Sequence, residues 1–90
     1  MKEFTQEMLD KLHAANDATR GTVEYTKYHM QCDFKHNGKW KFCGWSIPYT
    51  TGKIKTVKDK TYIIAEYVGC IERHPERYEV DNAVKELLGI

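Results

Sequence analysis

Ninety residues suffice for one domain with a single core, so residues 1–90 are expected to fold as one unit. An apolar fraction of 41% and a charged fraction of 30% are ordinary for a globular protein and exclude wholesale disorder. No apolar run approaches the roughly 20 residues that would span a bilayer. The first residues contain no hydrophobic signal segment, and a cytoplasmic location is therefore expected.

The net charge of +1 hides an uneven distribution along the chain. Residues 20–60 hold nine basic and three acidic side chains, a net charge of +6, whereas residues 1–19 carry −2 and residues 61–90 carry −3. Such asymmetry indicates an anionic partner. It is equally compatible with a basic sheet that is matched by acidic helices of the same chain.

Residues 5–19 are predicted to form a helix. Thr5 suits the N-cap position, and Gly21 can take the left-handed conformation that ends a helix. The apolar residues of this segment recur at helical spacing and define one buried stripe: Met8, Leu9, Leu12 and Ala15.

Residues 22–49 are predicted to form a β-hairpin around Asn37-Gly38, a pair suited to a type I′ turn. In that register the numbers of facing residues sum to 75, so Cys32 faces Cys43 and Met30 faces Trp45 on one apolar face. The other face carries His29, Gln31, Asp33 and Lys35 opposite Ser46, Gly44, Phe42 and Trp40. A bulge or bend is expected near Thr26-Lys27, where the apolar phase changes.

The second half of the chain is less regular. Residues 53–57 are predicted to add a third strand, and residues 80–88 a short amphipathic helix that ends at Gly89. Residues 60–73 fit a helix capped by Asp59, but the run that begins at Tyr62 could instead start a buried strand. We favour the helix on length and on the placement of its polar residues.

The resulting fold class is α+β, with a small antiparallel three-stranded sheet around the central β-hairpin, one N-terminal helix and two C-terminal helices, in the order αβββαα. The αβββα order of residues 5–73, with lysines at the start of the second helix, resembles the topology of double-stranded RNA-binding domains. The resemblance is architectural only, because that family's residue pattern is not matched along the strands, and the first helix is net acidic.

A first candidate site is the polar face of the hairpin, where two aromatic rings stand among basic and amide side chains. Aromatic rings can stack on single-stranded bases while lysines meet phosphates, and an exposed Trp is also a common hot spot for a protein partner. Alternatively, the last helix of the chain could cover the rings. The residues concerned are Trp40, Phe42, Lys27, Lys35, His29 and Gln31.

A second candidate is a series of lysines at the third strand and the start of the next helix, where amide hydrogens attract anions. Alternatively, these lysines could be a solvated edge that discourages pairing between sheets. They are Lys53, Lys55, Lys58 and Lys60.

The cysteines, Cys32, Cys43 and Cys70, have no C-x-x-C spacing and are expected to be reduced, packed thiols rather than a disulfide. No metal-ligand spacing and no cofactor motif is present, so the sequence predicts neither a metal site nor a cofactor. Cys70 and His74, four residues apart, could form a small catalytic dyad, but no motif of a known enzyme class supports it.

The sequence therefore favours a non-enzymatic binding module for an anionic macromolecule, either nucleic acid or an acidic protein surface, with no membrane partner. One alternative is a protein–protein inhibitor or adaptor, of the kind that phages and plasmids encode. The least favoured alternative is the Cys70/His74 enzyme.

Overall fold

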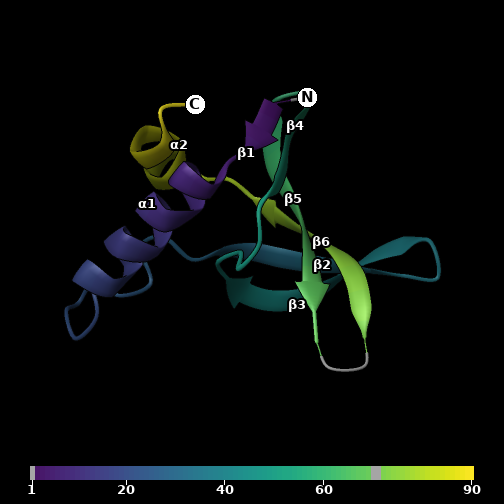
Figure 1. Ribbon diagram of the computed structural model, residues 1–90, viewed down its shortest axis with the longest axis horizontal. Helices are drawn as coiled ribbons and strands as arrows, with labels where there is room; N and C mark the ends of the chain where they lie inside the picture. The colour runs from purple at the N-terminus through teal and green to yellow at the C-terminus, as the bar shows by residue number, and fades with distance from the viewer. Residues whose placement is uncertain (1, 70–71) are drawn as a thin grey trace.

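A computed structural model describes residues 2–69 and 72–90. It shows two helices and one six-stranded antiparallel sheet (Figure 1). The strands lie in the order β1-β4-β5-β6-β2-β3, so β1 and β3 form the two edges. In chain order the elements are β1 (Lys2–Phe4), α1 (Gln6–Ala18), β2 (Met30–His36), β3 (Lys39–Ser46), β4 (Gly52–Val57), β5 (Lys60–Val68), β6 (Arg73–Glu79) and α2 (Asn82–Leu88).

The predicted three-stranded αβββαα fold is wrong, because the described residues form six strands and only two helices. Three additional strands enlarge the sheet: β1 at the N-terminus, and β5 and β6 in place of the expected middle helix and the loop after it. The predicted resemblance to the topology of double-stranded RNA-binding domains is therefore also wrong, because it required that middle helix.

The segment expected to be helical is a strand because its apolar residues alternate between two faces. Ile63 and Ala65 are buried on one face, and Tyr62 and Ile64 are half-buried on the other. The run of Thr, Tyr and two Ile at residues 61–64 is also rich in β-branched and aromatic residues, which favour strands.

Strand β6 includes Pro75, which the sequence analysis used as a helix breaker. Pro75 faces Glu66 of β5. On the other side of β6, the pairing with β2 ends at Glu76, the residue next to Pro75, so the proline is not part of that ladder. Proline lacks an amide hydrogen, so its place just beyond that ladder fits its chemistry.

Both terminal helices are confirmed. The Thr5 hydroxyl accepts a hydrogen bond from the amide of Met8 at the start of α1. At α2, the Asp81 carboxylate accepts from the amide of Val84, and Gly89 ends the helix with a φ of 73°. The start of α1 and both ends of α2 therefore form through local side-chain and glycine chemistry that the sequence already shows. The end of α1 differs, because the helix stops at Ala18 with Thr19 as its C-cap, before the predicted stop at Gly21.

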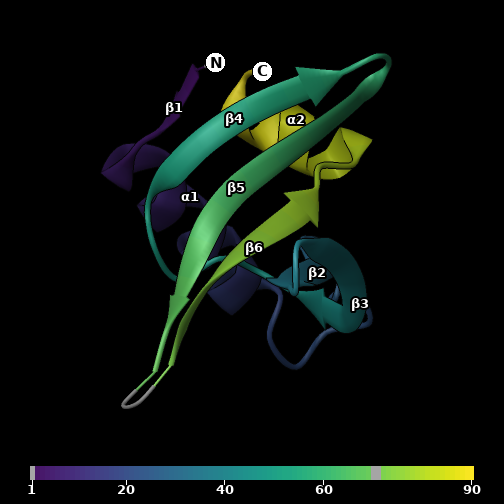
Figure 2. The same cartoon turned by 90° about the vertical axis from the view of Figure 1, so that its right-hand side faces the viewer.

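The two helices cover one face of the sheet and leave the other face bare, as Figure 2 shows with the strands in front and the helices behind. The segment 47–51 crosses from edge strand β3 to β4 on the helix side, where the Pro48 carbonyl accepts a hydrogen bond from His13 of α1 at 2.7 Å. The core lies between these layers: Phe4, Leu9, Leu12, Met30, Cys32, Ile47, Ile54, Ile63, Ala65, Tyr78, Val80, Val84 and Leu88.

The predicted hairpin register holds only near the turn. Residues 33–36 face residues 42–39 as expected, but the register then shifts by one at a bulge, so that Cys32 faces Gly44 and Met30 faces Ser46. Gly44 has a φ of 143°, which favours glycine there. The expected bulge or bend near Thr26-Lys27 falls within a series of turns over residues 19–28, so the chain changes direction there before β2 begins and not within a strand.

No helix in the described part of the chain is long and apolar enough to cross a membrane.

A candidate binding face on the sheet

On the bare face of the sheet, two long rows of side chains run across the strands. Residues directly opposite each other in an antiparallel sheet point to the same side, so the registers define each row. One row contains Glu3, Lys53, Ile64, Arg77, Asp33 and Phe42. The other contains Lys55, Tyr62, Glu79, Gln31 and Trp45, with Trp40 and Lys35 paired beside them at the end of the hairpin.

Three aromatic rings of β3 lie on this face. Phe42 and Trp45 are 60% and 65% exposed, so neither is covered by α2 or by any other described element. Trp40 is half-buried, because the guanidinium carbon of Arg77 lies 4.8 Å from its ring centre. Arg77 is also 4.9 Å from the ring of Tyr62, and these two rings therefore enclose it.

Each carboxylate of the bare face forms an ion pair. Asp33 accepts a hydrogen bond from Arg77 at 2.8 Å, and Glu66 accepts one from Arg73 at 2.9 Å. The remaining pairs are Lys60 with Glu79, at 3.3 Å, and Lys53 with Glu3. Among the described residues, Lys35 and Lys55 have no carboxylate within ion-pair distance, so the uncompensated charge of this face is positive.

The residues predicted as a binding site fall into two groups. Trp40, Phe42, Lys35 and Gln31 share the bare face with three of the four predicted lysines, Lys53, Lys55 and Lys60. The lysines do not lead into a helix, since they belong to β4 and β5.

The other predicted residues lie at the margin of this face or away from it. His29 borders it, in a surface hollow of about 410 Å³ that it forms with Thr26 and Trp45. Lys27 lies away from the face, beside Tyr28 and near α2, and Lys58 is in the turn between β4 and β5 with a φ of 57°.

Trp45 was missed because the predicted register placed it on the apolar face opposite Met30. The bulge moves Trp45 to the bare face opposite Gln31. A glycine at position 44, within an otherwise regular strand, was the one signal in the sequence that could have indicated a bulge.

A cluster of polar groups that the sequence did not predict lies on the helix side of the sheet. Cys43 of β3 lies 3.2 Å from Cys32 of β2, measured between the sulfurs, and Cys32 lies 3.5 Å from the Oε2 atom of Glu76 of β6. The hydroxyl of Tyr78 donates a hydrogen bond to the Oε1 atom of Glu76 at 2.8 Å. Cys32 and Tyr78 are buried, and Cys43 is exposed, so the cluster extends from the core to the surface.

The surroundings of this cluster favour the protonated forms of its two buried groups. Burial, the hydrogen bond with Cys43 and the nearby Glu76 carboxylate all raise the pKa of the Cys32 thiol. Burial and the hydrogen bond to Glu76 raise the pKa of Tyr78. The prediction of a packed thiol is therefore correct for Cys32 and wrong for Cys43, which is exposed to solvent.

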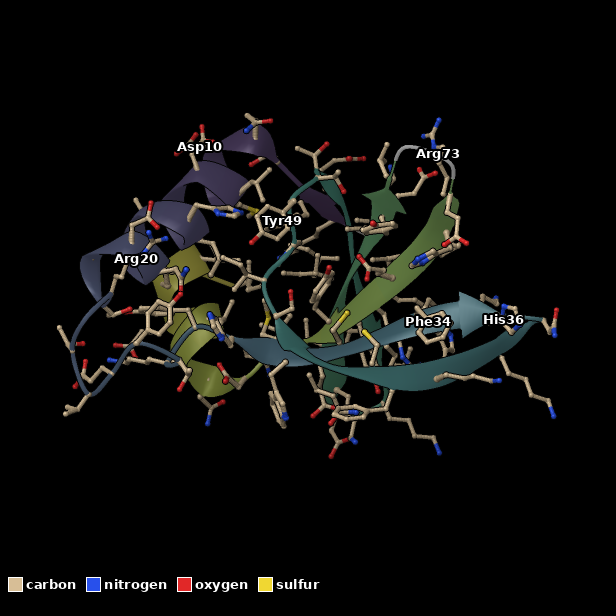
Figure 3. The ribbon with its side chains drawn as sticks, turned by 90° about the horizontal axis from the view of Figure 1, so that it is seen from below. Asp10, Arg20, Phe34, His36, Tyr49 and Arg73 are labelled. Atoms are coloured by element: carbon tan, nitrogen blue, oxygen red, sulfur yellow. The ribbon has the colours of Figure 1, made fainter. Side chains whose placement is uncertain are left out.

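The proposed Cys70/His74 dyad cannot be followed, because Cys70 lies outside the described residues. His74 is in strand β6, where its ring stacks on Tyr67 at a centroid distance of 4.9 Å and a tilt of 19°. It also lies 5.6 Å from the ring of Phe34, which Figure 3 shows near His36 at the end of the hairpin away from α1.

No protein-family model, curated protein or solved structure matches this chain.

Proposed function

We propose that the protein is a non-enzymatic binding module that engages single-stranded nucleic acid on the bare face of its sheet. The observation that carries the proposal is the pair of exposed rings, Phe42 and Trp45, on a face whose uncompensated charges are the ammonium groups of Lys35 and Lys55. Rings of this kind stack on bases of any sequence, and lysines meet the phosphates between them.

The dimensions of the face suit an extended strand rather than a small ligand. Trp45 and Lys55 stand at opposite ends of one cross-strand row, four strand spacings apart, which is about 19 Å. The hollow formed by Thr26, His29 and Trp45 lies at one end of this row. A base stacked on Trp45 would project into that hollow, while the phosphates would follow the row toward Lys55.

The ion pairs of the face support the same proposal. Carboxylates that pointed freely from the sheet would repel a phosphate backbone, but Glu3, Asp33, Glu66 and Glu79 each have a cationic partner. These pairs lower the electrostatic cost of bringing an anionic chain to the sheet.

The test is a titration of the protein with short single-stranded DNA and RNA homopolymers and with duplex DNA, followed by tryptophan fluorescence at low salt. The proposal expects saturable quenching with single strands and weaker binding of the duplex. Trp45→Ala should weaken binding about 10-fold or more, because a stacked base contributes roughly 1–3 kcal/mol.

Tyr49→Ala is the matched control. Tyr49 is 77% exposed but lies on the helix side, with its ring 5.0 Å from that of His13 of α1. Figure 3 shows Tyr49 on the side of the sheet where α1 lies. Its replacement should leave nucleic-acid affinity unchanged. Equal binding by both variants, or no binding of any single strand at low salt, would contradict the proposal.

A protein partner is the second candidate, and the position of β3 favours it. This strand is an edge of the sheet, so one of its sides is open to a strand from another protein. The exposed Phe42 and Trp45 project from the same strand and could anchor such a partner. A pull-down in which nuclease treatment leaves one protein bound, and Trp45→Ala removes it, would favour this alternative over the first.

A further inference from the structure

Three adjacent strands bring two thiols and a carboxylate together at the edge of the core. The ligand atoms of Cys32, Cys43 and Glu76 all lie within 4.8 Å of one another. They come from β2, β3 and β6, which are neighbours in the sheet and hold the three side chains on a rigid base. This cluster is independent of the bare face, because the three residues lie on the helix side.

The distances fit a bound ion better than a disulfide. Zinc–sulfur bonds of about 2.3 Å and zinc–oxygen bonds of about 2.1 Å in a tetrahedron place two sulfurs about 3.8 Å apart and a sulfur and an oxygen about 3.6 Å apart. The Cys32 and Cys43 sulfurs lie 3.2 Å apart, and the Cys32 sulfur lies 3.5 Å from Glu76. A disulfide would require the sulfurs to approach to about 2.05 Å, whereas a tetrahedral ion requires them to separate by only about 0.6 Å.

The hydrogen bonds of the cluster form a connected network that ends on the carboxylate of Glu76. Cys43 donates to Cys32, Cys32 donates to Glu76, and Tyr78 donates to the second oxygen of Glu76. A metal ion that replaced the two thiol protons would meet three anionic ligand atoms that already lie within 4.8 Å of one another. The Tyr78 hydroxyl would keep Glu76 in place, as outer hydrogen bonds do for metal-bound carboxylates.

We propose that Cys32, Cys43 and Glu76 form a binding site for a thiophilic divalent cation of the zinc type. Two thiolates select such an ion over magnesium or calcium, which prefer oxygen ligands. On binding, each thiol loses its proton to solvent and forms a sulfur–metal bond, and no oxidation is involved. Three protein ligands leave the fourth position to water or to a ligand from outside, and the exposed side of Cys43 gives access to it.

The test is titration of the reduced chain with Co²⁺, whose thiolate complexes have distinct absorption bands, followed by competition with Zn²⁺. It is run on the natural chain and on Cys70→Ser, which leaves Cys32 and Cys43 as the only thiols. Both should bind one ion with thiolate absorption. Cys43→Ser should weaken binding at least 100-fold, and Tyr78→Phe about 10-fold because it removes the outer hydrogen bond.

Far-UV circular dichroism of each variant checks that the fold is kept, and Cys43→Ser is well suited because its side chain is exposed. Glu76→Gln provides a second variant that keeps the shape of the side chain and should lower affinity about 10-fold. The proposal is overturned if Cys70→Ser shows no thiolate absorption, or if Cys43→Ser binds as tightly as the natural chain. Formation of a Cys32–Cys43 disulfide under reducing conditions with the ion in excess would overturn it as well.

Discussion

At the scale of single residues, Arg77 contacts three other side chains of the bare face at once. Its guanidinium group lies between the rings of Trp40 and Tyr62 and donates a hydrogen bond to Asp33, which is only 7% exposed. The guanidinium group of Arg77 therefore already has three partners within the protein. We infer that its main role is to hold Trp40 and Asp33 in place, and that the free lysines rather than Arg77 are available to an anionic ligand.

Replacing Asp33 with asparagine should lower the free energy of unfolding by about 2 kcal/mol. A fully buried ion pair that loses one partner costs about 3–5 kcal/mol, but the Arg77 side chain is 28% exposed and keeps part of its hydration. Chemical denaturation measures the change. Asp17→Asn is the control, because the Arg20–Asp17 pair is exposed and its loss should cost less than about 0.5 kcal/mol. Equal effects of both substitutions would show that the Asp33 pair contributes no more than a surface pair.

The raised pKa values of Cys32 and Tyr78 predict that the protein loses stability in alkali. In the unfolded chain these groups ionise near pH 8.5 and pH 10, whereas in the folded chain they keep their protons at those pH values. Unfolding therefore releases protons, and the free energy of unfolding should fall as the pH rises above about 8.5, by about 2 kcal/mol between pH 8 and pH 10. Denaturation at several pH values measures this change.

The variant with both Cys32→Ala and Tyr78→Phe should show a flatter dependence on pH, whatever its absolute stability. A slope as steep as that of the natural chain would show that other groups cause the alkaline loss.

At the scale of elements, the sequence predicted the parts whose signals are local. Thr5 and Gly89 mark helix ends, and Asn37-Gly38 marks the hairpin turn, because each acts on its own backbone. Residues 60–68 were mistaken for a helix because the apolar spacing at Ile64, Tyr67 and Val68 also fits a strand that is partly covered on both faces. Which pattern applies depends on strands β4 and β6 on either side, and no local signal in residues 60–68 reveals them.

The same reasoning applies to the candidate sites. Trp40 and Phe42 could be assigned to the polar face because they are close to the turn, where the register is fixed. Trp45 lies beyond the bulge, and one inserted residue reverses the face of every side chain after it. Glu76 is 44 residues from Cys32 in sequence, so its approach to the thiols depends on the pairing of β2 with β6 and could not be read from spacing.

Gly52→Ala should destabilise the protein by about 3 kcal/mol, because an added Cβ atom at this position would lie 2.0 Å from the backbone oxygen of Ile64 in β5. The clash would separate β4 from β5 and disturb the pairing of Gly52 with Phe4. Gly21→Ala is the control: its φ is 80°, but an added Cβ meets no atom within 4 Å, so only the backbone penalty of about 1 kcal/mol applies. Thermal and chemical unfolding compare the two, and a similar cost for both would contradict the close packing of β4 on β5.

At the scale of the whole molecule, the fold determines which charged side chains lie on the bare face and which of them form ion pairs. Some lysines of the basic segment 20–60 form ion pairs with acidic residues of the same chain. Lys53 pairs with Glu3 of the acidic N-terminal region, and Lys60 pairs with Glu79 of the acidic C-terminal region. The internal match and the anionic partner were two alternatives in the sequence. In the structure, ion pairs within the chain account for Lys53 and Lys60, whereas Lys35 and Lys55 have no acidic partner among the described residues.

If a phosphate backbone follows the bare face, the affinity should fall with salt in proportion to the number of phosphates that the lysines neutralise. Each contact with a single strand contributes about 0.7 to the slope of log affinity against log salt. Lys35→Ala and Lys55→Ala should each reduce the slope by about that amount, whereas Lys11→Ala on α1, on the other side of the sheet, should leave it unchanged. Binding at four or five salt concentrations measures these slopes. A reduction equal in all three variants would mean that binding follows net charge and not this face.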